Sequence, residues 1–258
     1  MCDQLGVNYL NIPLSDRKVF FFFFSLNALN LINNYLKLKN GALAIPEFGT
    51  DFVRGLLDQT KPASFADLLI ISGLSHGTNV WRNNADELIA SGITDLRGVI
   101  GCRDDIMTYL ISMGVEPLKA FTLMEKIRKG KGLKQDEEDM LRSCGVPEYY
   151  IQSCKKIAYL FPKAHATAYV TMAIRVGWFK VHHPLIFYAG FFSVRCDKYE
   201  WAPMIKGPEA ILARLKELDD LKREHPNDYS KKYEEIEKTL TVALEMYDRG
   251  IKFSNIDL

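Results

Sequence analysis

Residues 161–184 read FPKAHATAYVTMAIRVGWFKVHHP, and this pattern predicts one long helix. Pro162 suits the first turn of a helix, because the backbone N–H that proline lacks would have no partner within the helix there. The pattern ends at the adjacent His182 and His183, in front of Pro184. Neither histidine has a cysteine or a carboxylate nearby in the sequence, so the pair is interpreted as a helix end rather than a metal site.

Polar and aromatic side chains share one face of this predicted helix. At about 100° per residue, four of them fall on the same side: His165, Tyr169, Met172 and Val176. Free N–H groups of the first turn, joined by Lys163 and His165, would form an anion site, and Tyr169 would stack on a base. A core helix whose histidine and tyrosine are simply hydrogen-bonded explains the same residue types equally well.

Helical patterns separated by glycine and proline continue outward from this stretch in both directions. Ser64 fits an N-cap with Asp67 three residues later, and that helix is expected to stop at Gly73. Further helices are expected over 83–90, 102–113, 117–130 and, from residue 208 onward, as two amphipathic helices around the loop HPND. The predicted fold class is therefore mostly α, an irregular multi-helix domain.

Composition narrows the class of protein. The chain has 258 residues, 48% hydrophobic and 25% charged, which excludes a disordered, collagenous or disulfide-stapled chain. Lys plus Arg number 33 against 32 Asp plus Glu, so any anion binding must come from local clusters. Five cysteines without a CxxC pair indicate a reducing, cytoplasmic setting and no structural zinc.

The run VFFFFFSL at 19–26 resembles the apolar core of a signal peptide. Asp16 stands beside the basic residues that precede the run, and several asparagines interrupt the apolar pattern after it. A buried strand or helix is therefore the favoured interpretation, and a membrane-associated helical protein is the alternative. No membrane partner is expected.

A basic loop, RKGKG at 128–132, is the second candidate site. Its glycines would let the backbone approach a ligand, and its cations together with Lys126 would bind phosphate. A helix C-cap with cations on the helix dipole explains the same pattern. The acids at 136–139 are interpreted as a solvated helix start rather than as catalytic groups. Common nucleotide, zinc-protease and hydrolase motifs are absent.

Several segments, in order, resemble the C-terminal part of the bacterial DNA polymerase III alpha subunit of PolC type. They are IPEFGTDFVRGLL (45–57), ISGLSHGTNVW (71–81), GVIGCRDDIMTYLI (98–111), MEKIRKGKGL (124–133), the stretch 146–184 and ALEMYDRGI (243–251). KAHATAY at 163–169 is the most specific of them. The resemblance covers about residues 42–258, and more weakly 12–20.

This resemblance implies the mostly helical fingers domain of a C-family polymerase, which closes on the incoming deoxynucleoside triphosphate and the template base. It divides the chain into a poorly matched segment (1–41), the fingers core (42–200) and a charged helical extension toward a helix-hairpin-helix region (201–258). The residues it assigns to nucleotide are Lys163, His165, Tyr169, Arg128 and Lys129. Those it assigns to nucleic acid are Lys126, Lys131, Arg103, His76 and Arg175.

The family's two-metal chemistry needs carboxylates that lie in the palm, and this sequence contains no Asp-x-Asp. The resemblance therefore implies a fragment that is inactive alone, with no catalytic residue, metal or cofactor of its own. Mg²⁺ would be bound through the palm of the full polymerase. Expected partners are primer-template DNA, deoxynucleoside triphosphate, the palm and thumb, and the sliding clamp and other replisome proteins through other regions. A freestanding nucleic-acid-binding module without catalysis is the alternative.

Overall fold

The structure is a computed structural model that describes residues 1–254, and within that range every regular element is a helix. The mostly α fold class is therefore confirmed. The contacts divide the chain into two units: unit 1 comprises Met1–Ile45 and Ile174–Leu258, and unit 2 comprises Pro46–Ala173. The division near residue 45 lies close to the boundary expected after residue 41, whereas residue 200 falls inside unit 1.

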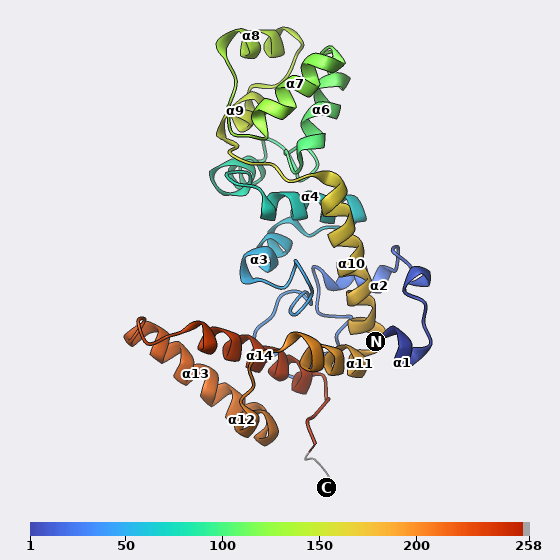
Figure 1. Cartoon of the computed structure of the whole chain (residues 1–258), viewed down its shortest axis with the longest axis vertical. Coiled ribbons are helices and arrows are strands. Elements are labelled where there is room, and N and C mark those ends of the chain that lie inside the picture. The colour runs from blue at the N-terminus through green and yellow to red at the C-terminus, as the bar shows by residue number, and fades with distance from the viewer. Residues whose placement is uncertain (255–258) are drawn as a thin grey trace. The chain divides into compact units, whose positions relative to one another are not determined.

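Unit 1 is built from the N-terminal segment and the C-terminal helices (Figure 1). Its elements are α1 (Cys2–Leu5), η1 (Tyr9–Asn11), α2 (Arg17–Phe22), the second half of α10 (Lys163–His182), α11 (Pro184–Gly190), η3 (Phe191–Arg195), α12 (Trp201–Lys206), α13 (Pro208–Glu224) and α14 (Lys231–Asp248). The helices α13 and α14 match the two amphipathic helices expected around HPND, and α10 ends at His182 as the sequence predicts.

The phenylalanine run forms part of the core of unit 1. Helix α2 contains its first half, and Phe22 and Phe23 are completely buried. The ring of Phe22 packs where Gly177 of α10 leaves space, since a Cβ there would lie 2.7 Å from the ring. The run is therefore helical through Phe22 and partly buried, because Phe21 on the same helix is 53% exposed. None of the described helices combines the length and apolar character needed to cross a bilayer.

A buried lysine connects four segments of unit 1. The Lys180 ammonium donates to the carbonyl oxygens of Gly41 (2.7 Å) and Leu43 (2.6 Å) and to the Glu245 carboxylate (2.9 Å). Tyr188 donates its hydroxyl proton to the same carboxylate at 2.7 Å. Because both charged groups are fully buried, these hydrogen bonds replace the water that each would otherwise need.

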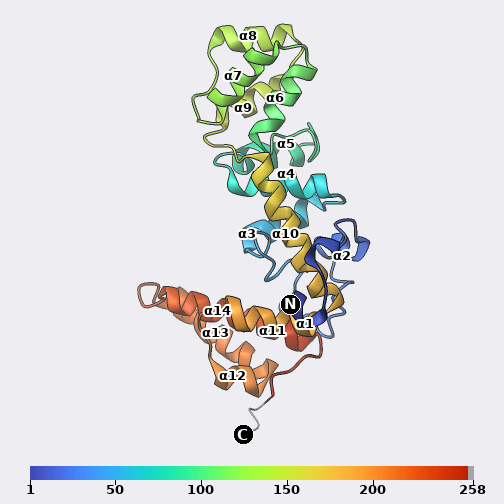
Figure 2. The same ribbon diagram turned by 45° about the vertical axis from the view of Figure 1, so that its right-hand side comes forward.

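Unit 2 consists of helices of 5 to 12 residues together with the first half of α10 (Figure 2). They are α3 (Asp51–Thr60), α4 (Phe65–His76), η2 (Trp81–Ala85), α5 (Asp86–Ala90), α6 (Arg103–Ser112), α7 (Pro117–Ile127), α8 (Gln135–Ser143), α9 (Glu148–Lys156) and the first half of α10. Ser64 caps α4 by accepting the Asp67 N–H at 3.2 Å, and Pro117 opens α7, both as predicted.

Two helix boundaries differ from the prediction. Helix α4 continues through Gly73 to His76. A Cβ at Gly73 would lie 2.3 Å from the carbonyl oxygen of Gly101, so this glycine serves a close approach between segments and is not a stop. In the second case, Asn83 adopts φ 58°, and the regular helix expected from residue 83 begins at Asp86.

Candidate nucleotide and nucleic-acid site

One short extended stretch, residues 158–161, collects the candidate residues of unit 2; we call it the central segment. Five backbone hydrogen bonds hold it: Thr78 N–H to Tyr159 O (3.0 Å), Ala158 N–H to Thr78 O (3.0 Å), Tyr159 N–H to Thr78 O (3.4 Å), Arg103 N–H to Phe161 O (3.2 Å) and Leu160 N–H to Arg128 O (3.4 Å). They join it to the C-terminal ends of α4 and α7 and to the start of α6, just before α10 begins. The sequence-predicted positions 76, 103, 128 and 163 therefore all border one segment.

An aromatic cluster lies where α4, the central segment and α10 meet. Its members are His76, Phe161, His165 and Tyr169. The His76 ring stacks on Phe161 with centroids 4.7 Å apart, and it is parallel to the Tyr169 ring at 6.3 Å. His165 meets Tyr169 edge-on at 4.7 Å and is exposed. The cluster presents a partly exposed set of ring faces and edges, which suits a planar ligand.

Glu47 and Ser72 fix the orientation of the His76 ring. The ring Nδ1 donates to the Ser72 carbonyl oxygen at 2.8 Å, and Nε2 lies 2.8 Å from a Glu47 carboxylate oxygen. Glu47 holds this position with a left-handed backbone (φ 67°), which is costly for a residue with a Cβ. The local sequence around Glu47 predicts no role for it, because nothing there relates it to a histidine 29 residues later.

Two acids of α6 occupy the start of α10. Asp104 accepts the Lys163 backbone N–H at 2.9 Å, and Asp105 accepts the Lys163 ammonium at 2.8 Å. The hydrogen bond to Asp105 raises the pKa of Lys163. The expectation that the first N–H groups of this helix are free is therefore wrong for Lys163, because a carboxylate of the chain already caps it. An anionic ligand would have to replace these carboxylates.

Arg103 is the cation beside this helix start that lacks a good partner. Its Nε is buried without a hydrogen-bond partner, and the nearest carboxylate oxygen, of Asp104, lies 3.8 Å away. A buried N–H without an acceptor is uncommon in a folded protein. Arg103 therefore has an unsatisfied donor beside the start of α10.

The basic loop after α7 is already paired with an acid. Arg128 makes a two-pronged contact with Glu125 at 2.5 and 2.8 Å, and Lys129 reaches the same carboxylate at 3.0 Å. These hydrogen bonds, the one from Arg128 foremost, lower the pKa of Glu125 to about 2. Gly130 has φ 69°, and a Cβ there would lie 2.7 Å from the Ala158 carbonyl oxygen. The close approach at this glycine is therefore to the central segment and not to a ligand.

The two lysines assigned to nucleic acid in this region, Lys126 and Lys131, differ in whether an acid of the chain pairs with them. Lys126 is paired with the buried Glu137 at 2.5 Å. Although burial alone would raise the pKa of Glu137, the hydrogen bonds from Lys126 and from the Lys134 N–H lower it overall. Lys131 is exposed and makes no ion pair within residues 1–254. Lys131 is thus the more available of the two for a phosphate group.

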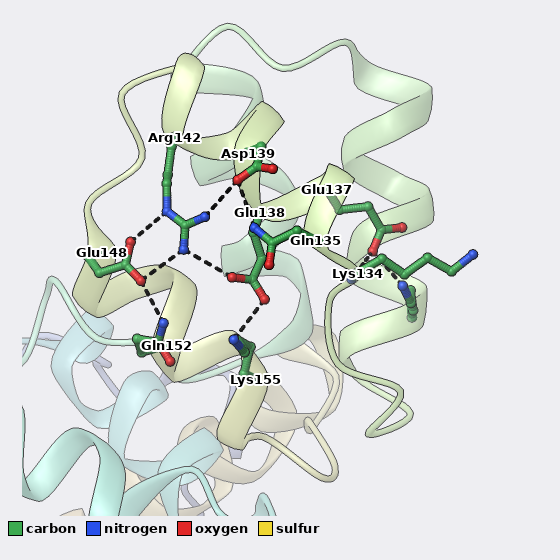
Figure 3. A network of polar contacts seen from close by, with 10 residues as sticks. Lys134, Gln135, Glu137, Glu138, Asp139, Arg142, Glu148, Gln152 and Lys155 are labelled. Atoms are coloured by element: carbon green, nitrogen blue, oxygen red, sulfur yellow. Dashed lines mark hydrogen bonds and ion pairs between the residues drawn. The ribbon is translucent and has the colours of Figure 1, made fainter.

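The acids at 136–139 begin helix α8 as predicted, but they are not all solvated. Glu138 is buried and receives Lys155 at 2.8 Å and Arg142 at 3.0 Å. Figure 3 shows the Arg142 guanidinium directed at three carboxylates, of Glu138, Asp139 and Glu148. The hydrogen bond from Arg142 is the main cause that lowers the pKa of Glu148 to about 2. This network joins α8 to α9 and serves their packing.

Arg175 belongs to unit 1, where its guanidinium lies 5.2 Å from the ring centre of Tyr9 and its Nε is buried without a hydrogen-bond partner. It is therefore not part of the group around the central segment. Across the described part of the chain, no three His, Cys, Asp or Glu side chains form a group that could hold a metal ion.

Comparison with known proteins gives a consistent result. The model of the family described as "Bacterial DNA polymerase III alpha subunit finger domain" matches residues 2–144. Curated relatives named DNA polymerase III PolC-type are similar over 99% of this chain, with 51% identity in Oceanobacillus iheyensis, 48% in Bacillus subtilis and 47% in Streptococcus pneumoniae.

The chain spans 18% of the length of each of these relatives. The resemblance inferred from the sequence motifs is confirmed. The expectation that residues 1–41 are poorly matched is wrong, because both the family model and the relatives align with nearly all of that segment.

Proposed function

This chain belongs to the bacterial DNA polymerase III alpha subunit finger domain family, and from that premise we propose that it binds an incoming deoxynucleoside triphosphate beside primer-template DNA. The observation that carries the proposal is the aromatic cluster at the start of α10, bordered by the cations held around the central segment. Ring faces for a base and cations for phosphates meet in unit 2, which is the combination that a nucleotide requires.

In this proposal each side chain has a distinct task. Tyr169 and His165 contact the base. The His76 ring, which is parallel to the Tyr169 ring, helps to set the orientation of Tyr169. Lys163 binds the phosphates of the triphosphate. Since Asp104 and Asp105 hold Lys163 in the free chain, the triphosphate would exchange places with carboxylates that keep the ammonium charged and oriented.

The basic loop takes part through the same kind of exchange. Arg128 and Lys129 share the Glu125 carboxylate, so a phosphate group would compete with that acid for a preformed pair of cations. We assign Lys126, Lys131, Arg103, His76 and Arg175 to nucleic acid. Lys131, which is exposed and unpaired in the described part, is the strongest of these assignments.

Nucleotidyl transfer itself is proposed for the complete polymerase. Two Mg²⁺ ions there would activate the primer hydroxyl and stabilise the leaving pyrophosphate. The described residues of this chain do not fit such a metal site, since they hold no group of three ligand side chains. The task of this chain is to bind and orient the nucleotide. Its proposed partners are the palm and thumb, and, through other regions of the polymerase, the sliding clamp.

The test is a comparison of Tyr169→Ala with Thr167→Ala. Thr167 is exposed on the same helix and its hydroxyl donates to the Lys163 carbonyl oxygen, so its replacement controls for a change in α10 itself. Loss of a stacked base is worth about 1–3 kcal/mol, so Tyr169→Ala should weaken triphosphate binding to the chain with primer-template by about 5-fold or more. Thr167→Ala should leave it near the parent value.

A second variant, Lys163→Ala with His165→Ala, tests the phosphate side. Unchanged triphosphate affinity in both variants would remove the nucleotide assignment. If DNA binds and the matching triphosphate never tightens that binding, the chain is a nucleic-acid-binding module instead.

A further inference from the structure

Two acids of unit 2 hold the cations to which the proposed function assigns the phosphates. The Lys163 ammonium lies 2.8 Å from an Asp105 oxygen, and Arg128 and Lys129 share the carboxylate of Glu125. All five residues belong to unit 2. We call Asp105 and Glu125 the internal acids.

Asp105 is fixed in place, whereas its partner Lys163 is not. One Asp105 oxygen accepts the Lys163 ammonium, and the other accepts the backbone N–H of Cys102 at 2.8 Å, within the cap of α6. The Lys163 side chain is 47% exposed and has a flexible four-carbon stem. The ammonium, rather than the carboxylate, is therefore the group that can move to a phosphate.

Glu125 holds its two cations through local contacts. Arg128 and Lys129 follow it by three and four residues, the spacing at which side chains along a helix meet. Their hydrogen bonds, that of Arg128 foremost, lower the pKa of Glu125 to about 2. This acid is therefore ionised at neutral pH, and it competes there for the same cations as a phosphate.

A tethered carboxylate is a stronger competitor than the same group free in solution. Its tether keeps its effective concentration beside the cation high. A singly charged ion such as chloride offers the cation nothing that the carboxylate does not. A triphosphate offers several charges and many acceptor oxygens at once, so it can displace the internal acids where chloride cannot.

We propose that Asp105 and Glu125 are internal competitors, which occupy the phosphate-binding cations of the free chain, exclude singly charged anions and are displaced by a polyphosphate. The ligand is the triphosphate of the proposed function, on which this step rests. Removal of either carboxylate should therefore strengthen the binding of a polyphosphate. A carboxylate whose main effect was to aim the cation at the ligand would give the opposite sign.

The experiment titrates the 258-residue chain with inorganic tripolyphosphate and, in the presence of primer-template, with the matching deoxynucleoside triphosphate. Asp105→Asn removes the charge and keeps an oxygen for the Cys102 N–H, so it should tighten both ligands by about 2- to 5-fold, the effect of losing a competing surface ion pair. Asp136→Asn is the matched control. Asp136 is exposed and makes no ion pair within residues 1–254, so its replacement should leave both affinities near the parent values.

Two further measurements separate competition from a general effect of charge. Asp105→Asn made in a Lys163→Ala chain should change neither affinity, because the ammonium that Asp105 occupies is gone. Salt screens the internal pair, so the advantage of Asp105→Asn over the parent should shrink between about 0.05 M and 0.5 M sodium chloride. Glu125→Gln should tighten tripolyphosphate as Asp105→Asn does, and the two effects should multiply, since the two acids hold different cations.

Unchanged or weaker tripolyphosphate binding in both Asp105→Asn and Glu125→Gln would overturn the proposal. So would an equal gain from Asp105→Asn in the Lys163→Ala chain, since the acid would then act without its cation. Tripolyphosphate has no base, so Tyr169→Ala should bind it like the parent. If Tyr169→Ala also binds the nucleoside triphosphate like the parent, the nucleotide assignment fails, while tighter tripolyphosphate binding in the acid variants still supports the internal competitors.

Discussion

Glu47 has a strained backbone conformation that positions its carboxylate beside His76. Its left-handed conformation places a carboxylate oxygen 2.8 Å from His76, whose ring faces Phe161 and Tyr169. Such strain persists where the surrounding structure enforces it, and it is common at functional sites. We therefore propose that Glu47 is a positioning residue, which acts through the His76 ring on the proposed nucleotide site.

Replacing Glu47 with glycine separates the two roles of this residue. Glycine adopts the left-handed conformation without strain, so the free energy of unfolding of Glu47→Gly should stay within about 1 kcal/mol of the parent. The His76 ring loses its anchor, and triphosphate affinity should fall several-fold. Urea unfolding and nucleotide titration of the same preparation measure both quantities.

A structural role alone would give a different result for Glu47. Stability and affinity would then fall together in Glu47→Gly, or the affinity would not change at all. Glu47→Gln is the matched comparison, because it keeps the strained backbone and an acceptor for Nε2 while it removes the charge.

At the level of elements, Glu125 of α7 and Glu148 of the α8–α9 network make the stability of unit 2 sensitive to acid. The pKa values of Glu125 and Glu148 lie at about 2 in the folded chain, below the ordinary 4.5, because arginine hydrogen-bonds to both. A lowered pKa means that the stabilisation is complete above the unfolded value and is lost as pH falls toward 2. The melting temperature should therefore decrease steadily from about pH 5 downward.

Glu148→Gln should flatten that decrease. It removes one of the groups whose protonation costs stability, so the difference in melting temperature between parent and variant should shrink as pH falls. Glu209→Gln is the control, since Glu209 is exposed and makes no ion pair within the described residues. If the parent and Glu148→Gln show parallel curves down to about pH 2.5, the network does not set the acid sensitivity.

Local signals in the sequence predicted most of the elements and a part of the candidate site. Caps and prolines such as Ser64 and Pro117 located helix starts correctly, because their effect depends on residues within one turn. The predicted helix stop at Gly73 is wrong, because glycine is needed there for the close approach of the Gly101 backbone, 28 residues later. The pairing of Lys163 with Asp104 and Asp105 was missed for the same reason, whereas Glu125 lies three residues before Arg128 and was within reach of sequence analysis.

On the scale of the whole molecule, unit 1 combines residues 1–45 with residues from 174 onward, and Lys180 hydrogen-bonds to both parts. Replacing it with methionine leaves the buried Glu245 without its cation. Loss of one partner of a buried pair costs about 3–5 kcal/mol, so Lys180→Met should lower the free energy of unfolding of unit 1 by that amount. Urea unfolding followed by the fluorescence of Trp178 and Trp201, both in unit 1, measures it.

The double variant Lys180→Met with Glu245→Gln checks the cause. It removes both charges and keeps a group that Tyr188 can hydrogen-bond, so it should be more stable than Lys180→Met alone. A double variant that is less stable than either single variant would mean that packing, and not the unpaired charge, dominates at this position.

The hydrogen bonds of the central segment limit which sequence changes this part of the chain can tolerate. Its four residues are held through main-chain atoms to three other segments, at Thr78, Arg103 and Arg128. Substitution of a side chain there leaves those bonds in place, but insertion or deletion of a single residue would shift the register of all of them at once. We therefore expect the length of this segment to be constrained more tightly than its composition, and variation in loop length within unit 2 to fall in the connections elsewhere.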